Sequence, residues 1–578
     1  MKLLTSIKFL ARQGLPLRGD GGGEVDGNFN QLLQLRSDDE SDGKLAQWIK
    51  KKSSKYTSHD IQNEILQIMA LRILRTLLES IQSSKFTIMI DETTDVGTQE
   101  QVVVVFRWVD SHLVSHEDFV GLYVTDLITS NALVGLIKDV LLRMNLKLEN
   151  CRGQCYDGAS NMSGRISGVS TQLLNEEPRA IYTHCYGHAL NLACQDTVRS
   201  VKVVKDALDT TFELSKLLKY SSKRNAAFKK IKDDIAPSEP GFRTLCPTRW
   251  TVKADSLGSV IKNYSVLQTS LDAFTHMAAR DMEMSARVNG IASQLDKFDF
   301  LFGVFLGEKV LRLADNLSCT LQRKELSAAE GNSAALLTCD ALSALRNNHE
   351  FEQFWSTVLD KASAVGIEEP VLPRRRRAPA RFEIGEGSPH YHSSVKDYYR
   401  PQFFEAIDLI VRCIKDRFNQ PGFQVYSKLE KLLLNAANKR SIDSEFDEII
   451  KLYGSDFNPP VLKTQLQILS TKFATPVSFS AVKKFLVDLG EAQSVLSEVV
   501  KLVSLILVMP ATNATSERSF SALKRVKTYL RTSMKQQRLN NLMLLHVHKE
   551  LTDKLDLLAC ANDFVSVNER RLQVFGKF

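Results

Sequence analysis

The sequence predicts an α/β protein in which a mixed sheet, covered by helices, is interrupted by a large all-α insertion. Three observations predict this class. Short apolar runs rich in β-branched and aromatic residues lie between residues 86 and 125, strand and helix patterns then alternate, and helical periodicity dominates from about residue 256 to 505. With 578 residues the chain exceeds what one compact core usually holds, so several domains are expected.

The predicted sheet begins with three strands in succession, joined by turns short enough for an antiparallel meander. The expected strands are residues 86–90, 102–109, 118–125, 151–156 and 180–187, and the expected helices between them are residues 131–146 and 168–176. This order, β-β-β-α-β-α-β, is that of an RNase H-like domain. We therefore expect an RNase H-like mixed sheet in residues 84–255.

The remaining segments are predicted to be mostly helical. The expected parts are an N-terminal helical lead-in over residues 1–83, with a turn-rich linker or surface loops at 15–43, an all-α insertion over 256–505 with an exposed loop near 366–400, and a C-terminal region over 506–578 that completes the core. No apolar run is long enough to cross a bilayer, so no membrane partner is expected.

Composition and charge narrow the class of protein. Hydrophobic residues make up 43% and charged residues 25% of the chain, which is ordinary globular composition. The formal charge of +8 permits a polyanionic partner without requiring one. Nine cysteines, an odd number with no regular spacing, argue against a secreted disulfide scaffold and favour a reducing compartment.

Two carboxylates occupy chemically informative positions. Asp91 closes the first predicted strand and Asp157 follows the fourth, and the ends of those strands can be neighbours in a sheet of this order. Paired carboxylates repel unless a divalent cation neutralises them. A third carboxylate would complete a site for two magnesium ions that hydrolyse a phosphodiester. The alternative is that both are solvated surface groups, as most of the 67 acidic residues must be.

Five short motifs surround these residues. They are FTIMIDETTD at 86–95, CYDGASNMSG at 155–164, HCYGHALNL at 184–192, CPTRW at 246–250 and ATSERSFSALKRVKTYLR at 514–531. In this order the set resembles the hAT superfamily of cut-and-paste DNA transposases, in the branch related to MYM-type and TTF-type zinc finger proteins. The resemblance covers residues 50–255 and 490–555 well and the middle loosely. It implies an RNase H-like core and a C-terminal hAT dimerisation region.

The resemblance also assigns the site. It implies that Asp91, Asp157 and Glu517 are the three catalytic, metal-binding carboxylates and that Mg²⁺ or Mn²⁺ is the cofactor. Glu517 would lie on a C-terminal helix capped by Thr515 or Ser516. The apolar side of that helix would be Phe520, Leu523, Val526 and Leu530. The alternative for Glu517 is a carboxylate that merely favours the first turn of the helix.

Two further motifs match the family. Cys185 and His188 form its Cys-x-x-His motif, for which we expect a packing or site-supporting role; zinc is not expected, because four ligands at tetrahedral spacing are not evident. Arg249 and Trp250 match its Arg-Trp pair, in which arginine would hold phosphate and tryptophan would stack on a flipped base. The alternative for Trp250 is a core residue at the start of the helical region.

Basic residues and leucines near the C-terminus give the expected partners. A basic face follows Glu517 closely and is the predicted DNA-binding patch: Lys524, Arg525, Lys527, Arg531, Lys535 and Arg538. The arginine run 374–377 could bind DNA or direct nuclear import, or be a solvated loop. The resemblance implies a dimer or higher homo-oligomer formed through the C-terminal region, where leucines could alternatively complete the monomer core: Leu539, Leu542, Leu545, Leu551, Leu555 and Leu558.

One departure from the family leaves two hypotheses open. Transposases of this branch usually begin with a zinc-binding BED or TTF-type module, whereas no Cys/His cluster precedes Asp91 and the first cysteine is Cys151. We therefore expect the sequence-specific DNA reader to be lost or encoded elsewhere. The chain is then either a nuclear, metal-dependent enzyme that cleaves and transfers DNA strands, or a domesticated, inactive, dimerising nuclear protein that binds DNA or chromatin.

Overall fold

The chain forms two compact units in the computed structural model. The structure describes residues 1–18, 27–39, 43–51, 55–245, 253–278, 281–323, 326–372, 392–474 and 476–578. The sheet unit comprises residues 1–185, 324–329 and 421–578, and the helical unit comprises residues 186–323 and 330–420. These borders differ from the expected ones, because the chain leaves the sheet at residue 185 and its helices after residue 420 pack back onto it.

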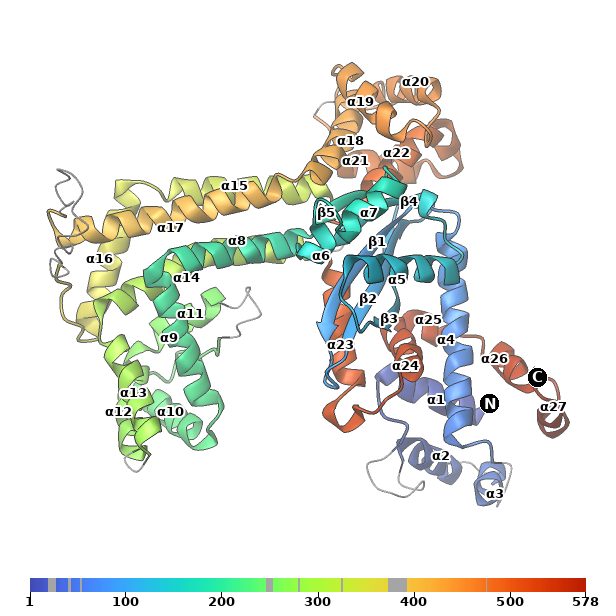
Figure 1. The fold of residues 1–578 in the computed structure, drawn as a ribbon, viewed down its shortest axis with the longest axis horizontal. Helices are drawn as coiled ribbons and strands as arrows, with labels where there is room; N and C mark the ends of the chain where they lie inside the picture. The colour runs from blue at the N-terminus through green and yellow to red at the C-terminus, as the bar shows by residue number, and fades with distance from the viewer. Residues whose placement is uncertain are drawn as a thin grey trace. The chain divides into compact units, whose positions relative to one another are not determined.

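The sheet has five strands in the order β3-β2-β1-β4-β5 (Figure 1). β1, β2 and β3 form an antiparallel meander, whereas β4 pairs parallel with β1 and β5 parallel with β4. The strands are β1 Phe86–Thr94, β2 Glu100–Val109, β3 Ser115–Val124, β4 Cys151–Tyr156 and β5 Ile181–His184. The predicted mixed sheet is confirmed, together with the helices α5 Ser130–Arg143 and α7 Val169–Glu176 that join its last strands.

The two faces of the sheet bury different helices, because successive side chains of a strand point to opposite sides. Ile88 and Ile90 of β1 belong to the core beneath α5 and α7. Met89 belongs to the core on the other face, with residues of α1, α4, α23 and α24. Asp91, two residues after Met89, therefore faces the side of the sheet on which the C-terminal helices pack.

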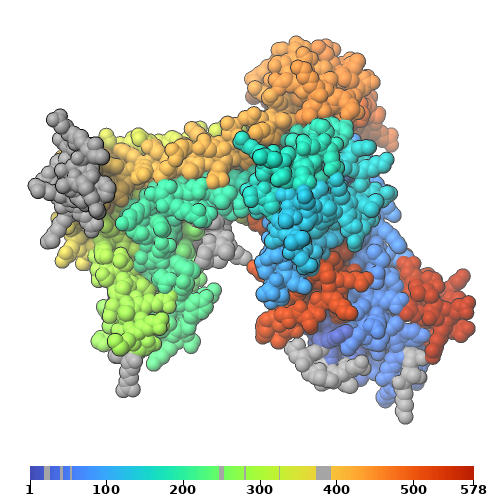
Figure 2. All heavy atoms as spheres, in the orientation of Figure 1, coloured from blue at the N-terminus to red at the C-terminus, as the bar shows by residue number. Residues whose placement is uncertain are grey.

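Helices from the two ends of the chain share that second core. They are α1 Lys2–Gln13, α2 Asn28–Asp38, α3 Lys44–Lys50 and α4 His59–Ile81 from the N-terminus, and α23 Ala514–Val526, α24 Gln536–Val547, α25 Lys549–Asp553, α26 Leu557–Ser566 and α27 Glu569–Phe575 from the C-terminus. α24 packs on α4, α1 and β3, and in Figure 2 the C-terminal residues lie against the N-terminal ones. The expected linker at 15–43 is wrong in part, because α2 lies within it and buries Phe29 and Leu33.

The C-terminal leucines divide between core and surface. Leu539, Leu542 and Leu545 are buried in the second core, and Leu551 and Leu555 pack against it. Leu558 is exposed. Five of the six leucines thus complete the monomer, so self-association would have to use other side chains of this region.

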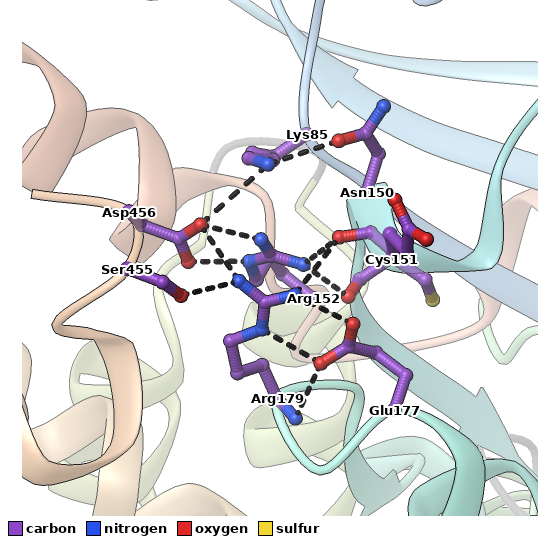
Figure 3. Close-up of polar contacts among 9 residues, drawn as sticks. Lys85, Asn150, Cys151, Arg152, Glu177, Arg179, Ser455 and Asp456 are labelled. Carbon is purple, nitrogen blue, oxygen red and sulfur yellow. Dashed lines mark hydrogen bonds and ion pairs between the residues drawn. The ribbon is translucent and has the colours of Figure 1, made fainter.

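Five helices that follow residue 420 belong to the sheet unit, where α18 packs on β5 and α22 packs on β2. They are α18 Pro421–Ala437, α19 Asp443–Tyr453, α20 Pro459–Ser470, α21 Phe479–Asp488 and α22 Ser497–Leu507. A cluster of ion pairs joins them to the sheet (Figure 3): Asp456, between α19 and α20, accepts hydrogen bonds from Arg152 of β4 at 2.5 and 2.6 Å. Arg179 and Lys85 approach the same carboxylate at 3.2 and 3.5 Å.

The helical unit contains helices only, in the part that the structure describes. Its helices are α8 Tyr186–Ser200, α9 Lys202–Lys219, α10 Ser222–Ile235, α11 Lys253–Lys262, α12 Tyr264–Met277, α13 Met282–Leu295, α14 Phe298–Leu321, α15 Ala328–Ala344, α16 Asn348–Ala364 and α17 Val395–Phe418. The first residues of α15 belong to the short segment assigned to the sheet unit. The short helix α6 Ser160–Ser163 also lies in the sheet unit. Much of the expected loop near 366–400 lies outside the described residues, and α17 begins before Pro401, which it contains. None of the described helices is long and apolar enough to cross a membrane.

Candidate functional site

The parallel pairing of β1 with β4 brings Asp91 and Asp157 to the same level of the sheet. Met89 is the register partner of Cys155, and each carboxylate follows two residues later in its own chain segment. Asp91 does not close its strand as expected: it lies inside β1, opposite Val103 of β2. Asp157 comes directly after β4, and its Oδ1 accepts a hydrogen bond from the amide of Ala159 at 3.2 Å.

Glu517 reaches the same region from the other end of the chain. It lies in the first turn of α23, which packs on β1, β2 and β3. The predicted helix is confirmed, but it ends at Val526, so Leu530 lies outside it and is exposed. Asp91 lies within range of the charges of both Glu517 and Asp157, so it is the common neighbour of the other two predicted carboxylates.

Asn513, at the N-cap position of α23, fixes where this helix starts. Its side-chain amide donates to the carbonyl of Ile90 at 2.8 Å, one residue before Asp91. Its backbone N–H donates to Sγ of Cys185 at 3.1 Å, and the Cys185 N–H donates to the carbonyl of Tyr156, one residue before Asp157. Cys185 thus links the backbone before Asp157 to the start of α23, and Asn513 links the start of α23 to the backbone before Asp91. The cap is Asn513 and neither Thr515 nor Ser516.

A buried ion pair holds the first turn of α23 from the other side. Arg107 of β2 donates to Glu117 of β3 at 2.6 Å and to the carbonyl of Leu507 at 2.9 Å. Thr515 donates its hydroxyl hydrogen to the other oxygen of Glu117. Sequence reasoning missed these contacts, because a charged pair in two strands carries no sequence signal of what packs over it.

Burial and like charges set the electrostatics of the site. Burial, with the charges of Glu517 and Asp157, raises the pKa of Asp91 to about 8. Burial likewise raises the pKa of Glu517, which the neighbouring Arg518 lowers. Glu92 is a fourth acid beside Asp157: burial, with the charges of Asp157 and Glu100, raises its pKa to about 7. Sequence reasoning did not include Glu92, although it directly follows Asp91.

The carboxylates share one region without forming a finished coordination shell. Among the residues that the structure describes, no group of three or more His, Cys, Asp or Glu side chains is close enough to hold a metal ion. The donor set itself is composed of carboxylate oxygens, which suits Mg²⁺ and Mn²⁺. Mutual repulsion of the same carboxylates is what a divalent cation would relieve.

The raised pKa of Asp91 predicts a pH effect on stability. An unfolded aspartate titrates near 3.8, whereas the folded one holds its proton to about 8, so this residue's contribution to stability falls as the pH rises between these values. The slope is at most about 1.4 kcal/mol per pH unit. Asp91→Asn should therefore melt at a higher temperature than wild type in EDTA, by a margin that grows from pH 5 to pH 8. A margin that shrinks over this range would contradict the assignment.

The predicted basic face is only partly correct. Lys524 and Arg525 are exposed on α23. Lys527 is not available to DNA: its side chain is 1% exposed and pairs at 2.6 Å with Asp95, which is equally buried. Arg531 turns inward and donates to the carbonyls of Val526 and Gly14 at 2.7 and 3.3 Å. The helix ends at Val526 and is too deeply packed there to present all of the predicted residues on one exposed face.

Other predicted residues lie apart from this site or outside the described chain. His188 is a half-buried residue of α8, in the helical unit. Arg249, Trp250 and the arginine run 374–377 lie outside the described residues. Their predicted roles in binding DNA or in nuclear import remain predictions.

Comparison with known proteins finds two matching families. Residues 1–168 match the family described as "ZMYM1/FAM200, RNase-like domain", and residues 478–551 match the "hAT family C-terminal dimerisation region". The chain thus carries an RNase-like domain and a hAT-type dimerisation region. The two matches include β1 with Asp91, β4 with Asp157 and α23 with Glu517, so the candidate site is built from both of the matched regions.

Two relatives are similar along nearly the whole chain. The human protein named "52 kDa repressor of the inhibitor of the protein kinase" is 23% identical over 583 residues, which cover 96% of this chain and 75% of the relative. The mouse protein of the same name is 22% identical over 581 residues, with the same shares covered. The alignments with these relatives also cover the part of the chain between the two matched regions. The sequence motifs showed only a loose resemblance to the transposase family there.

Proposed function

We propose that this protein is a metal-dependent enzyme that cleaves DNA strands at Asp91, Asp157 and Glu517. The observation that carries the proposal is that the fold gathers these three carboxylates from positions 91, 157 and 517 onto one face of an RNase-like sheet. A structural role alone does not require a buried aspartate whose pKa is raised by burial and by the charges of two further acids, at a cost in stability. Such perturbed carboxylates are typical of functional sites.

The three carboxylates share one task in this proposal, and basic residues nearby have another. Asp91, Asp157 and Glu517 would hold Mg²⁺ or Mn²⁺, which would supply charge neutralisation and activation of water at the phosphodiester. Asp91 lies inside β1, and the contacts of Asn513 with Ile90 and Cys185 position the helix that carries Glu517 beside it. Lys524 and Arg525, exposed on the same helix as Glu517, would contact DNA phosphates nearby.

A second function is favoured by two observations. The carboxylates do not form a ready coordination shell, and the chain carries a dimerisation region. These support a domesticated protein that self-associates in the nucleus and contacts DNA or chromatin without cutting it. The two proposals share the fold and the homo-oligomer and differ only in catalysis.

A cleavage assay separates them. The full chain is incubated with a labelled DNA duplex and Mn²⁺, alongside Asp91→Asn, Glu517→Gln and the control Glu491→Gln, an exposed acid near the start of the dimerisation region. Cleavage by wild type and the control, reduced to background in the two site variants, is the expected result. Folded wild-type protein that leaves the duplex intact, or site variants that cut as well as wild type, would rule out the enzyme.

A further inference from the structure

An exposed serine lies in the wall of a basic groove of the sheet unit. The groove has a volume of about 590 Å³ and is lined by the segment before α2, by α4, by the connection after α23 and by α24. Ser533 lines it, in the exposed turn between Arg531 and α24. Thr532 is exposed as well, but it is not among the residues that line the groove. Ser533 is therefore accessible to a modifying enzyme and borders the groove.

Cationic side chains from both ends of the chain line this groove. They are Arg18, Arg531, Lys535 and Arg538. Burial, with the charges of Arg18 and Arg531, lowers the pKa of Arg538 to about 10. The guanidinium groups therefore lie close enough to repel one another, and an anion between them would relieve that repulsion.

Acids in the wall offset only part of this charge. The lining acids are Asp60 and Glu64. Both oxygens of Glu64 accept hydrogen bonds from Arg571, at 2.5 and 2.8 Å. The side chains that line the groove thus carry more positive than negative charge.

The start of α24 adds a second attraction for an anion. The first backbone N–H groups of a helix carry a partial positive charge and have no partner within the helix. Lys535 is the N-cap residue of α24 and makes no side-chain cap hydrogen bond. Ser533 lies two residues before this cap, so a phosphate on its side chain would lie near both the start of the helix and Arg538 in its first turn.

We propose that Ser533 is a phosphorylation site whose phosphate is bound by Arg538 and Arg18. The phosphoryl donor is a nucleoside triphosphate held by a protein kinase. Oγ of Ser533 forms a bond to the terminal phosphorus, the bond from that phosphorus to its bridging oxygen breaks, the nucleoside diphosphate leaves, and the hydroxyl proton passes to the kinase. A kinase with an acidic substrate groove fits this segment, because Arg531 and Lys535 lie two residues before and after the serine.

The phosphate would fasten the two ends of the chain to each other. It carries a charge of about −1.5 to −2 at neutral pH, and guanidinium groups are the side chains best suited to its oxygens. Arg18 precedes α2 and Arg538 lies in α24. Since α24 already packs on α1 and α4, the phosphate joins segments that are in contact and requires no rearrangement of the helices.

Phosphorylation of the full chain in vitro tests the acceptor. The chain is incubated with ATP and a serine/threonine kinase that prefers basic substrates, and the modified residue is identified by mass spectrometry. Ser533→Ala should lose the label, whereas Thr532→Ala, which removes the neighbouring hydroxyl outside the groove, should keep it. Folded wild-type chain in which Ser533 takes up no phosphate would overturn the proposal.

Phosphorus NMR of the phosphorylated chain tests whether the groove binds the phosphate. The second ionisation of phosphoserine has a pKa of about 6, and the arginines should lower it by about one unit. Arg538→Gln and the exposed Arg18→Gln should each reduce this shift, whereas Arg570→Gln, an equal charge change on α27, should leave it unchanged. Thermal melting shows whether each variant is folded. A phosphate on Ser533 that titrates near its ordinary value, or equally in wild type and Arg18→Gln, would overturn the proposal.

Discussion

Replacing Asp456 with asparagine is expected to lower the free energy of unfolding by about 3–5 kcal/mol. Arg152, whose side chain is fully buried, would then keep its charge without a counter-ion, and Arg179 and Lys85 would lose their shared partner. Burial alone would raise the pKa of Asp456, but the hydrogen bond and charge of Arg152 and its neighbours hold it below the usual value. This contribution is present at neutral pH and is lost as the pH falls through the folded pKa.

Denaturant unfolding of two further variants makes the prediction specific. Arg152→Met should lower the free energy of unfolding by less than Asp456→Asn does, because Asp456 would keep its ion pairs with Arg179 and Lys85. Asp443→Asn, which removes an exposed pair with Lys463, should cost at most about 1 kcal/mol. Equal costs for Asp456→Asn and Asp443→Asn would show that the cluster in Figure 3 does not hold the helices after residue 420 to the sheet.

Lys527→Met is expected to lower the free energy of unfolding by a similar amount, about 3–5 kcal/mol. It leaves Asp95 buried with hydrogen bonds from Gln101, Gly97 and Gln99 but without its cation. Because Lys527 directly follows α23 and Asp95 lies in the turn after β1, the pair fixes the far end of the helix that carries Glu517. The affinity of this variant for DNA should fall only to the extent that the protein unfolds, because the lysine does not face solvent and cannot contact DNA directly.

A double-mutant cycle checks the pair. The variant Asp95→Asn/Lys527→Met should be more stable than the sum of the two single losses predicts, because it leaves no unpaired buried charge. Lys524→Gln is the control on the exposed side of the helix and should change stability by less than about 0.5 kcal/mol. A Lys527→Met protein as stable as this control would contradict the buried pair.

The strands were predictable because their patterns are local. VVVVFRWV at 102–109 and FTIMI at 86–90 are apolar enough to require burial, and both form strands. The extension of β1 beyond Asp91 was not predictable, since Asp91, Glu92 and two threonines form a polar sequence. Those residues are held in the strand by ladder hydrogen bonds to β2, which depend on the tertiary fold.

The sequence allowed the residues of the candidate site to be predicted, but not the contacts that position them. The resemblance assigned Asp91, Asp157 and Glu517, and the structure makes them neighbours. It could not reveal Asn513, although an asparagine before a helix is a recognised cap signal, or the pairing of Lys527 with Asp95. The sequence does not distinguish a basic residue that faces DNA from one that pairs with a buried acid, because charge alone does not determine whether a side chain is exposed.

Binding of Mn²⁺ to the full chain, measured by titration calorimetry at pH 7.5, tests the central claim most directly. The claim is that Asp91, Asp157 and Glu517 form one cation site. Wild type should bind Mn²⁺ with release of protons, because the pKa of Asp91 is raised to about 8. Asp91→Asn, Asp157→Asn and Glu517→Gln should each weaken that binding at least tenfold, whereas Glu491→Gln should not. Wild-type affinity in all three site variants would show that the carboxylates are neighbours in the fold without being a metal site.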